Sequence, residues 1–128
     1  EQKYKLKTHD VFVNALAYSP DSDLLATASL DGLVKLWDVN TGRLVGILEG
    51  HTDSVTCLGF SPDGKILASG SVDQTIILWD VASGQAIQSL AGFLAPVEGV
   101  AFSPNGEWLA ASDWALVKLW ALPIYSGK

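Results

Sequence analysis

A repeat of 42 residues constrains the fold of this chain more than any other feature of its sequence. Three Ser-Pro pairs recur at this interval, beginning at Ser19, Ser61 and Ser103. Three tryptophans follow them, 42 and then 41 residues apart, at Trp37, Trp79 and Trp120. A period of this length is typical of proteins in which each repeat is one supersecondary unit that cannot bury its apolar surface alone. The chain is therefore expected to stack such units against one another.

Short apolar runs bounded by turn sequences fill each repeat, and they predict β-strands. The first half of the chain predicts strands over residues 3–7, 11–18, 24–29, 33–37, 43–48 and 54–60. The second half predicts strands over residues 65–71, 75–79, 85–90, 96–102, 107–112 and 116–120. Polar and apolar residues alternate over 3–7, which is typical of an edge strand with one solvated face.

The connections between these strands favour tight turns. Ser-Pro-Asp-Gly at 61–64 and Ser-Pro-Asn-Gly at 103–106 match a type I turn, whereas Ser22 replaces the glycine in the first repeat. Strands joined by such short connections must pair antiparallel. The run Ile76–Leu78 is apolar at successive positions, which predicts burial on both faces, as in sheets stacked face to face.

The composition excludes several classes of protein. With 128 residues, 48% of them hydrophobic and 17% charged, the chain is expected to form one packed globular domain. A net charge of −6 without a cluster of Lys or Arg argues against nucleic acid as a ligand. Neither a signal segment nor a membrane-spanning apolar run is present, so we expect no membrane association. The single cysteine, Cys57, is expected to be a buried apolar residue, and the cytosol is the expected compartment, if the chain is not part of a longer one.

The motifs resemble those of the WD40 family over nearly the whole chain. Gly50-His51, the Ser-Pro-Asp-Gly turn, Asp73 and Trp79-Asp80 fall at the spacing of that family. The resemblance implies an all-β fold, a β-propeller whose blades of four antiparallel strands surround a channel. In that family each repeat begins with the outer strand of one blade and continues with three strands of the next. We assign the repeats to residues 8–49, 50–91 and 92–128 of a single domain spanning 1–128, with three blades per chain.

The same resemblance implies a buried hydrogen-bonded set of four residues, here called a tetrad, in each of the first two repeats. The two tetrads are His9, Thr27, Asp31 and Trp37, and His51, Ser69, Asp73 and Trp79. A buried carboxylate is tolerated where donors satisfy it, and imidazole, hydroxyl and indole groups supply them. Ser, His and Asp also form hydrolase triads, but this set occurs twice and lacks a nucleophile elbow. We interpret the tetrads as structural and expect no catalytic residues, no metal site and no cofactor.

The third repeat departs from the pattern. Phe93 replaces the tetrad His, Ala111 replaces the Ser, and Ala121 replaces the Asp of the Trp-Asp pair. The hairpin before Trp120 is one residue shorter, which puts Asp113 out of register and Trp114 in the place of the tetrad Asp. Apolar groups thus replace the whole network. Such a replacement can be neutral for stability when all members of the network change together.

The family resemblance further implies a partner-binding ring face, built from the entry to the first strand and the second hairpin of each blade. The residues that map to it are Phe12, Asn14, Leu30, Ser54, Thr56, Val72, Pro96, Glu98, Asp113 and Trp114. Trp114 is either an anchor for a partner or a cover over the gap left by the missing tetrad. Trp108 falls at the strand position of Leu24 and Ile66, so we expect it in the core.

The two ends of the chain are incomplete in complementary ways. Three blades are too few for a ring, which needs at least about four. The third repeat lacks its outer strand, while residues 3–7 read as an outer strand without a blade. A cyclic homo-oligomer would repair both defects head to tail, as a dimer with six blades or a trimer with nine, and six is nearer the common range. The rival interpretation is a fragment of a longer WD40 protein.

These inferences favour a non-catalytic scaffold that presents its ring face to a protein or peptide. One alternative is a small-ligand or cation site in the central channel, to which the mapped face contributes only the carboxylates of Glu98 and Asp113. Another is an architectural role, in which ring formation itself tethers other domains.

Overall fold

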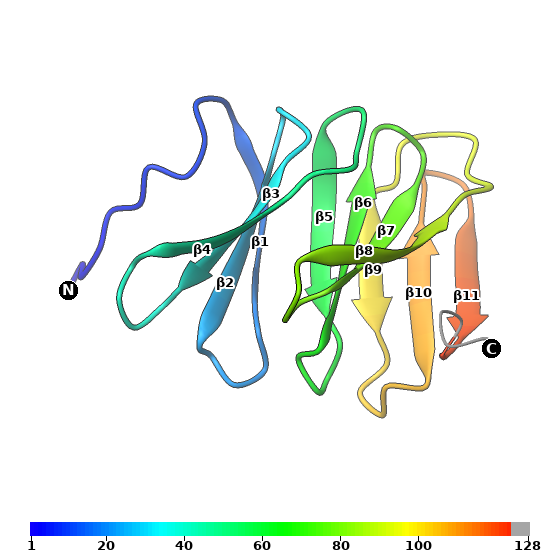
Figure 1. Ribbon diagram of the computed structural model, residues 1–128. Helices are drawn as coiled ribbons and strands as arrows, with labels where there is room; N and C mark the ends of the chain where they lie inside the picture. Colours follow the sequence, from blue (N-terminus) through cyan, green and yellow to red (C-terminus); the bar gives the residue numbers. More distant parts are fainter. Residues whose placement is uncertain (124–128) are drawn as a thin grey trace.

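The protein is a row of three antiparallel β-sheets, as seen in a computed structural model that describes residues 1–123. Figure 1 shows the sheets side by side, with the N-terminus beside the first sheet and β11 at the opposite end of the row. Residues 1–123 contain strands and turns and no helix, which confirms the all-β class expected from the sequence. The last five residues assigned to the third repeat lie outside the described residues.

Each sheet is built from strands that follow one another along the chain. Sheet one contains β1 (Val13–Tyr18), β2 (Leu24–Ser29), β3 (Val34–Asp38) and β4 (Leu44–Leu48). Sheet two contains β5 (Val55–Phe60), β6 (Ile66–Ser71), β7 (Ile76–Asp80) and β8 (Gln85–Leu90). Sheet three, within the described residues, contains β9 (Gly99–Phe102), β10 (Trp108–Ser112) and β11 (Val117–Ala121). For these eleven strands the predicted bounds differ from the observed ones by a few residues at most.

The strand predicted over residues 3–7 is not present. Residues 1–12 pair with no strand of residues 1–123 and instead extend alongside sheet one (Figure 1). The phenol of Tyr4 donates a hydrogen bond to the Asn40 carbonyl at 2.6 Å, and its ring lies against Gly42 in the turn between β3 and β4. An alternating pattern becomes a strand only when a neighbouring strand edge accepts its backbone hydrogen bonds. Sheet one is already complete on the β3 side through β4.

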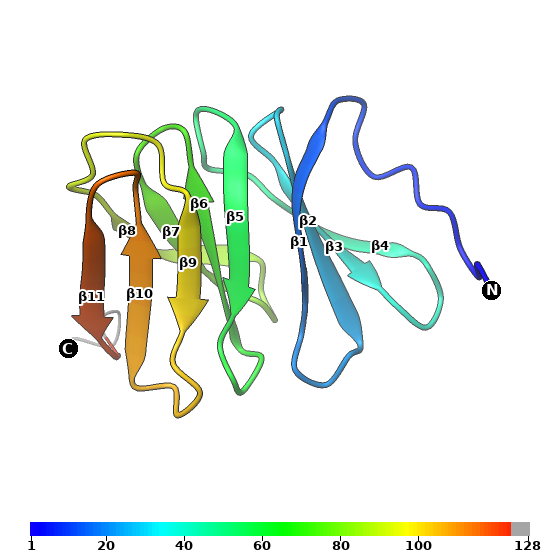
Figure 2. The ribbon, with the colours of Figure 1, turned by 180° about the vertical axis from the view of Figure 1, so that it is seen from behind.

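Two apolar cores fill the spaces between the sheets. The first strands β1, β5 and β9 lie side by side along the row (Figure 2), and the cores extend from them. Between sheets one and two the core consists of Ala26, Ala28, Val34, Leu36, Leu48, Val55, Leu67, Ile77 and Trp79. Between sheets two and three it consists of Cys57, Ile66, Ala68, Ile76, Leu78, Leu90, Phe93, Val97, Leu109 and Ala111. Strand β7 contributes to both cores, which explains its unbroken apolar run and confirms the predicted burial on both faces.

The outer faces of sheets one and three are exposed. On sheet one, the side chains of Leu16 and Tyr18 are 64% and 63% exposed. On sheet three, Val117 and Leu119 point outward in the same way, and Trp108 is 47% exposed. The expectation that Trp108 belongs to the core is therefore wrong in this chain. Its repeat position faces the next sheet along the row, and no sheet of the described chain follows sheet three.

The Ser-Pro turns share one backbone geometry in all three repeats. In each, the amide of the fourth residue donates to the carbonyl of the first serine at 2.9 Å. The fourth residue adopts a left-handed conformation, with φ of 75° at Gly64 and Gly106 and 67° at Ser22. Although Ser22 replaces the glycine of the other two turns, it is held in the same conformation as Gly64 and Gly106.

Gly70 provides a test of how closely sheets two and three pack. A methyl group at this position would lie 2.6 Å from both Cys57 Sγ and a Val97 methyl carbon, far inside contact distance. We expect Gly70→Ala to lower the free energy of unfolding by about 1–3 kcal/mol, the usual cost of overpacking a core. Gly59→Ala is the matched control, since its methyl would meet the Val100 carbonyl oxygen at an ordinary 3.5 Å. Urea denaturation of both variants measures the difference, and equal stabilities would contradict the packing described here.

Candidate functional site

One edge of the three sheets gathers the segments that were mapped to the ring face. This hairpin edge consists of residues 9–12, 30–33, 49–54, 72–75, 91–98 and 113–116, which lie along the upper side of Figure 1. The Ser-Pro turns lie at the opposite edge. The hairpin edge therefore brings together residues from all three repeats.

In the second repeat, four side chains form a continuous hydrogen-bonded chain below the hairpin edge. His51 Nδ1 lies 2.9 Å from Asp73 Oδ2, and His51 Nε2 lies 2.7 Å from Ser69 Oγ. The Trp79 indole N–H donates to the same Ser69 oxygen at 2.8 Å. We assign the imidazole as neutral with its proton on Nδ1, because it then donates to Asp73 and accepts from the Ser69 hydroxyl.

The four side chains of this hydrogen-bonded network are buried, which rules out access by a substrate. Ser69, His51 and Asp73 are spaced like the members of a hydrolase triad, but Ser69 and the His51 side chain are 0% exposed and Trp79 closes over the hydroxyl. A substrate carbonyl cannot reach the Ser69 oxygen. The Asp73 carboxylate also accepts the Thr52 amide at 3.0 Å, so the network ties the loop before β5 to the hairpin between β6 and β7.

The first repeat contains the same tetrad, with longer hydrogen-bond distances. His9 Nδ1 lies 3.4 Å from Asp31 Oδ2, and His9 Nε2 lies 3.0 Å from Thr27 Oγ1. The Trp37 indole donates to Thr27 at 3.1 Å. The Asp31 side chain is 29% exposed, compared with 8% for Asp73. The hairpin edge is therefore held more loosely at sheet one.

The third repeat replaces the tetrad with an aromatic pair and a cation. Phe93 packs edge-on against Trp120, with ring centroids 6.1 Å apart. The Lys118 ammonium lies 5.2 Å from the centre of the Phe93 ring and donates to the Gly92 carbonyl at 2.8 Å. Lys35 occupies the same position in sheet one and donates to the Thr8 carbonyl at 2.7 Å.

Asp113 is buried and its carboxylate is fully engaged. It accepts the amides of Ala115 and Leu116 at 2.8 and 2.7 Å. These two hydrogen bonds hold the pKa of Asp113 below its ordinary value. Ala115 and Leu116 belong to the same hairpin as Asp113, whereas Asp73 also accepts the Thr52 amide of the loop before β5. In sheet three it is Lys118 that ties the loop before β9, through the Gly92 carbonyl. Asp113 is 7% exposed and presents little surface to a partner or a cation.

Large apolar residues of the predicted ring face are exposed on the hairpin edge. Phe12, Leu30 and Trp114 are 77%, 49% and 81% exposed, so Trp114 does not cover the tetrad gap. Val72 and Pro96 are half-buried.

The polar residues mapped to that face make contacts between sheets. The Asn14 amide donates to Ser54 Oγ at 2.8 Å and to the Val55 carbonyl at 3.0 Å, which joins sheet one to sheet two. The Thr56 hydroxyl donates to the Val97 carbonyl, which joins sheet two to sheet three. Ser54 is only 4% exposed, whereas Glu98 is exposed at the end of the row. Of the mapped polar residues, Asn14, Ser54 and Thr56 thus join neighbouring sheets, while Glu98 is exposed and Asp113 is engaged within its own hairpin.

Leu94 is the exposed residue that sequence analysis missed. It is 86% exposed, more than any other large hydrophobic side chain among the described residues. Asp10 and Thr52 occupy its position in the first two repeats. An apolar residue where the other copies are polar was the signal that could have identified it.

The described residues contain no group of three or more His, Cys, Asp or Glu side chains placed to hold a metal ion. Within the same part of the chain, no helix is long and apolar enough to cross a membrane.

Ser69 is expected to be the most sensitive member of its tetrad. Ser69→Ala leaves the Trp79 indole and the His51 imidazole buried without a partner, and we expect it to lower the free energy of unfolding by about 1–3 kcal/mol. Ser69→Thr keeps the hydroxyl, as Thr27 does in sheet one, and should restore most of this loss. Denaturant unfolding of the two variants checks the expectation. An alanine variant as stable as the threonine variant would show that the hydroxyl does not hold the network together.

Asp73 should make stability depend on acid. Burial raises the pKa of Asp73, but hydrogen bonds from Thr75, His51 and the Thr52 amide outweigh it and hold the pKa below the ordinary value of 3.8. The stabilisation is present above that value and is lost as the pH falls through the lower folded-state pKa. Thermal unfolding between about pH 5 and about pH 2 should therefore show a smaller fall in melting temperature on acidification for Asp73→Asn than for the wild type. Asp10→Asn, which changes an exposed carboxylate, should show the same fall in melting temperature as the wild type.

Comparison with known proteins identifies the family. The model of the family described as WD domain, G-beta repeat matches residues 1–38, 42–80 and 84–121. Mitochondrial division protein 1 of Chaetomium globosum is 42% identical over 49 residues, which is 38% of this chain and 8% of that protein. The CCR4-associated factor 4 homolog of Candida glabrata is 45% identical over 47 residues, 36% of this chain and 8% of that protein. The general transcriptional corepressor TUP1 of Saccharomyces cerevisiae is 38% identical over 42 residues, 33% of this chain and 6% of that protein.

Solved structures show the same architecture. The WD40 repeats of RRP9 superpose with a TM-score of 0.88 at 29% identity, over 91% of this chain and 37% of that one. The structure of U3-55K gives the same TM-score and identity, over 91% of this chain and 38% of that one. The three sheets are thus β-propeller blades, and the chain spans less than a tenth of the length of the curated relatives it matches. Because the family model covers most of its length, the chain belongs to the WD40-repeat family.

Proposed function

We propose that the chain is a non-catalytic scaffold that binds a protein or peptide through its hairpin edge. The observation that carries the proposal is a set of large apolar side chains exposed on the loops and hairpins of this edge. They include Phe12, Leu30, Leu94 and Trp114. Isolated exposed apolar residues are common, but several gathered along one edge favour an interface, and aromatic residues are frequent anchors of binding energy.

The absence of catalysis belongs to the same proposal. The Ser-His-Asp sets that resemble catalytic triads are buried and satisfied within each sheet. The relatives' names refer to different processes, mitochondrial division, association with CCR4 and transcriptional corepression. A shared structure that serves different processes favours a binding role over a shared reaction.

The charge of the chain supports a protein partner rather than nucleic acid. Fourteen acidic against eight basic residues would repel a phosphate backbone. The exposed acids of the hairpin edge, Asp10, Asp31, Glu49, Asp53 and Glu98, favour a partner segment that combines apolar and basic residues. A single buried cysteine, Cys57, is compatible with the reducing cytosol, which we propose as the compartment. A cation site in the channel is the weaker candidate, because Asp113 is already engaged.

The proposal also requires that the outer faces of sheets one and three be covered. Leu16 and Tyr18 on one face, and Val117 and Leu119 on the other, are too exposed for a finished domain. The covering sheets come either from further copies of this chain, as a six-bladed dimer or nine-bladed trimer, or from other repeats of a longer WD40 protein.

Substitution at the hairpin edge tests the scaffold proposal. Partners captured by the wild-type protein are identified and purified, and their affinities are measured by calorimetry against variants. Trp114→Ala should weaken binding by at least about tenfold, as loss of an aromatic anchor does. Val45→Ala is the matched control, because Val45 is 55% exposed on β4, away from the hairpin edge. Equal affinities of the two variants for every captured protein would reject the hairpin edge as the binding surface.

A further inference from the structure

We propose that the outer face of sheet three receives a sheet from a different WD40 repeat, one that presents a Lys or Arg side chain to Glu98, and that a second copy of this chain fits there poorly. The inference rests on one part of the proposed function, namely that the outer faces are covered. It concerns the chemistry of the covering sheet, which the fold alone leaves open.

The sheets are joined by a polar contact that recurs in the repeat. Asn14 lies at the irregularity of the β1–β2 ladder, between Val13 and Ala15, and Thr56 lies at the same irregularity of the β5–β6 ladder. Such a bulge turns a side chain away from the regular alternation. Each residue donates a hydrogen bond to a backbone carbonyl at the start of the next sheet, that of Val55 or Val97. We call this contact the forward clamp.

Glu98 holds the forward-clamp position on sheet three. It lies 42 residues after Thr56, and Gly99 pairs with Ser112 as Cys57 pairs with Gly70. Its amide donates to the Ser112 carbonyl at 2.7 Å, which fixes its backbone against β10. The Glu98 side chain is exposed. An ionised carboxylate accepts hydrogen bonds and cannot donate them, so the clamp is reversed at this position. The sheet that follows must supply the donor.

A second copy of this chain offers no such donor. Stacked as sheets one and two are, its sheet one would bring Phe12 to the place of Ser54, which accepts from Asn14, and the Val13 carbonyl to the place of the Val55 carbonyl. The Glu98 carboxylate would then face an aromatic ring and a carbonyl oxygen, neither of which can donate a hydrogen bond to it, so the forward clamp could not form.

The free strand edge leads to the same conclusion. In sheet two, Ile77 of β7 stands opposite Ser89 of the outer strand. The same register on sheet three would place Lys5 of a second copy opposite Lys118 of β11. Like charges at directly opposed positions destabilise a strand pair. Two separate positions therefore disfavour self-association on this face.

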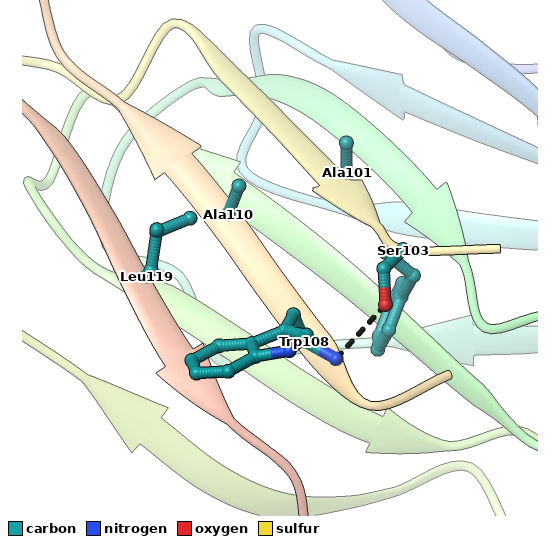
Figure 3. A pocket seen from close by; sticks show the side chains of 6 residues that line it. Ala101, Ser103, Trp108, Ala110 and Leu119 are labelled. Atoms are coloured by element: carbon teal, nitrogen blue, oxygen red, sulfur yellow. Dashed lines mark hydrogen bonds between the residues drawn. The ribbon is translucent and has the colours of Figure 1, made fainter. Parts of the chain in front are cut away.

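The rest of the face identifies the occupant as another sheet. Ala101, Ala110 and Leu119 line a shallow apolar hollow next to Trp108, whose amide donates to Ser103 Oγ at 2.9 Å (Figure 3). On sheet two the corresponding positions are buried by the neighbouring sheet, as Ile66 at 6% exposure illustrates. An apolar sheet face with one carboxylate at its rim fits an apolar sheet that carries one cation.

Self-association measured by sedimentation equilibrium tests the inference. The wild-type chain of 13.6 kDa should associate weakly through this face. Glu98→Thr, which copies Thr56, should strengthen association at least about tenfold by restoring a hydroxyl donor for the Val13 carbonyl of the second copy. Phe12→Arg should do the same by supplying the donor from the second copy, and this gain should disappear in the Glu98→Thr background. Glu107→Gln, an exposed carboxylate at the opposite edge of sheet three, should have no effect.

Two results would overturn the inference. One is a wild-type chain that is a closed ring at every concentration, and the other is a Glu98→Thr or Phe12→Arg chain that associates no more tightly than wild type. Near-ultraviolet circular dichroism confirms that each variant is folded, and Glu98→Asn, which copies Asn14, provides a second variant. Partner binding at Trp114 is measured separately, so either proposal can fail while the other stands.

Discussion

Burial of every sheet face by a neighbouring sheet is the constraint on which this structure depends. Strand β7 is apolar at successive positions, so it is stable only where it is covered on both sides. Sheet two meets this condition, because one core lies on each of its faces. Sheets one and three meet it on one side each. The hairpin edge stands on sheets that are packed in this way, and this packing positions the loops and hairpins that carry its exposed side chains.

Polar groups that the stacking buries are satisfied by two different solutions. In sheets one and two, an imidazole bridges a hydroxyl and a carboxylate, and thereby fixes a loop to a hairpin. In sheet three, Phe93 and Lys118 replace that bridge: Lys118 donates to the Gly92 carbonyl of the loop before β9, and Asp113 accepts amides of its own hairpin. The loop is secured in both cases. What changes is the surface above it, where Leu94 and Trp114 stand exposed in sheet three.

The repeat predicted most of the fold, because turn sequences and apolar runs are local signals. The predictions were wrong where the structure of a residue depends on a neighbouring strand or sheet. Residues 3–7 alternate like a strand but lie alongside sheet one without pairing to either of its edge strands, and Trp108 holds a core position on a face without a following sheet among the described residues. The spacing of the repeat was enough to identify the tetrad residues. The contacts of Asn14 and Thr56 with the next sheet could not be predicted in this way, because they depend on the distance between stacked sheets, which no pattern within one repeat contains.

The direction of the hydrogen bonds from Asn14 and Thr56 gives the row a polarity, much as a filament of identical subunits has two unlike ends. Each donor reaches toward the sheet synthesised after it. Sheets one and two each present a donor at the side that faces the following sheet, and the following sheet offers carbonyl groups in return. Two such sheets turned donor side to donor side would leave both donors unmet, so repeats joined in this way add in one orientation.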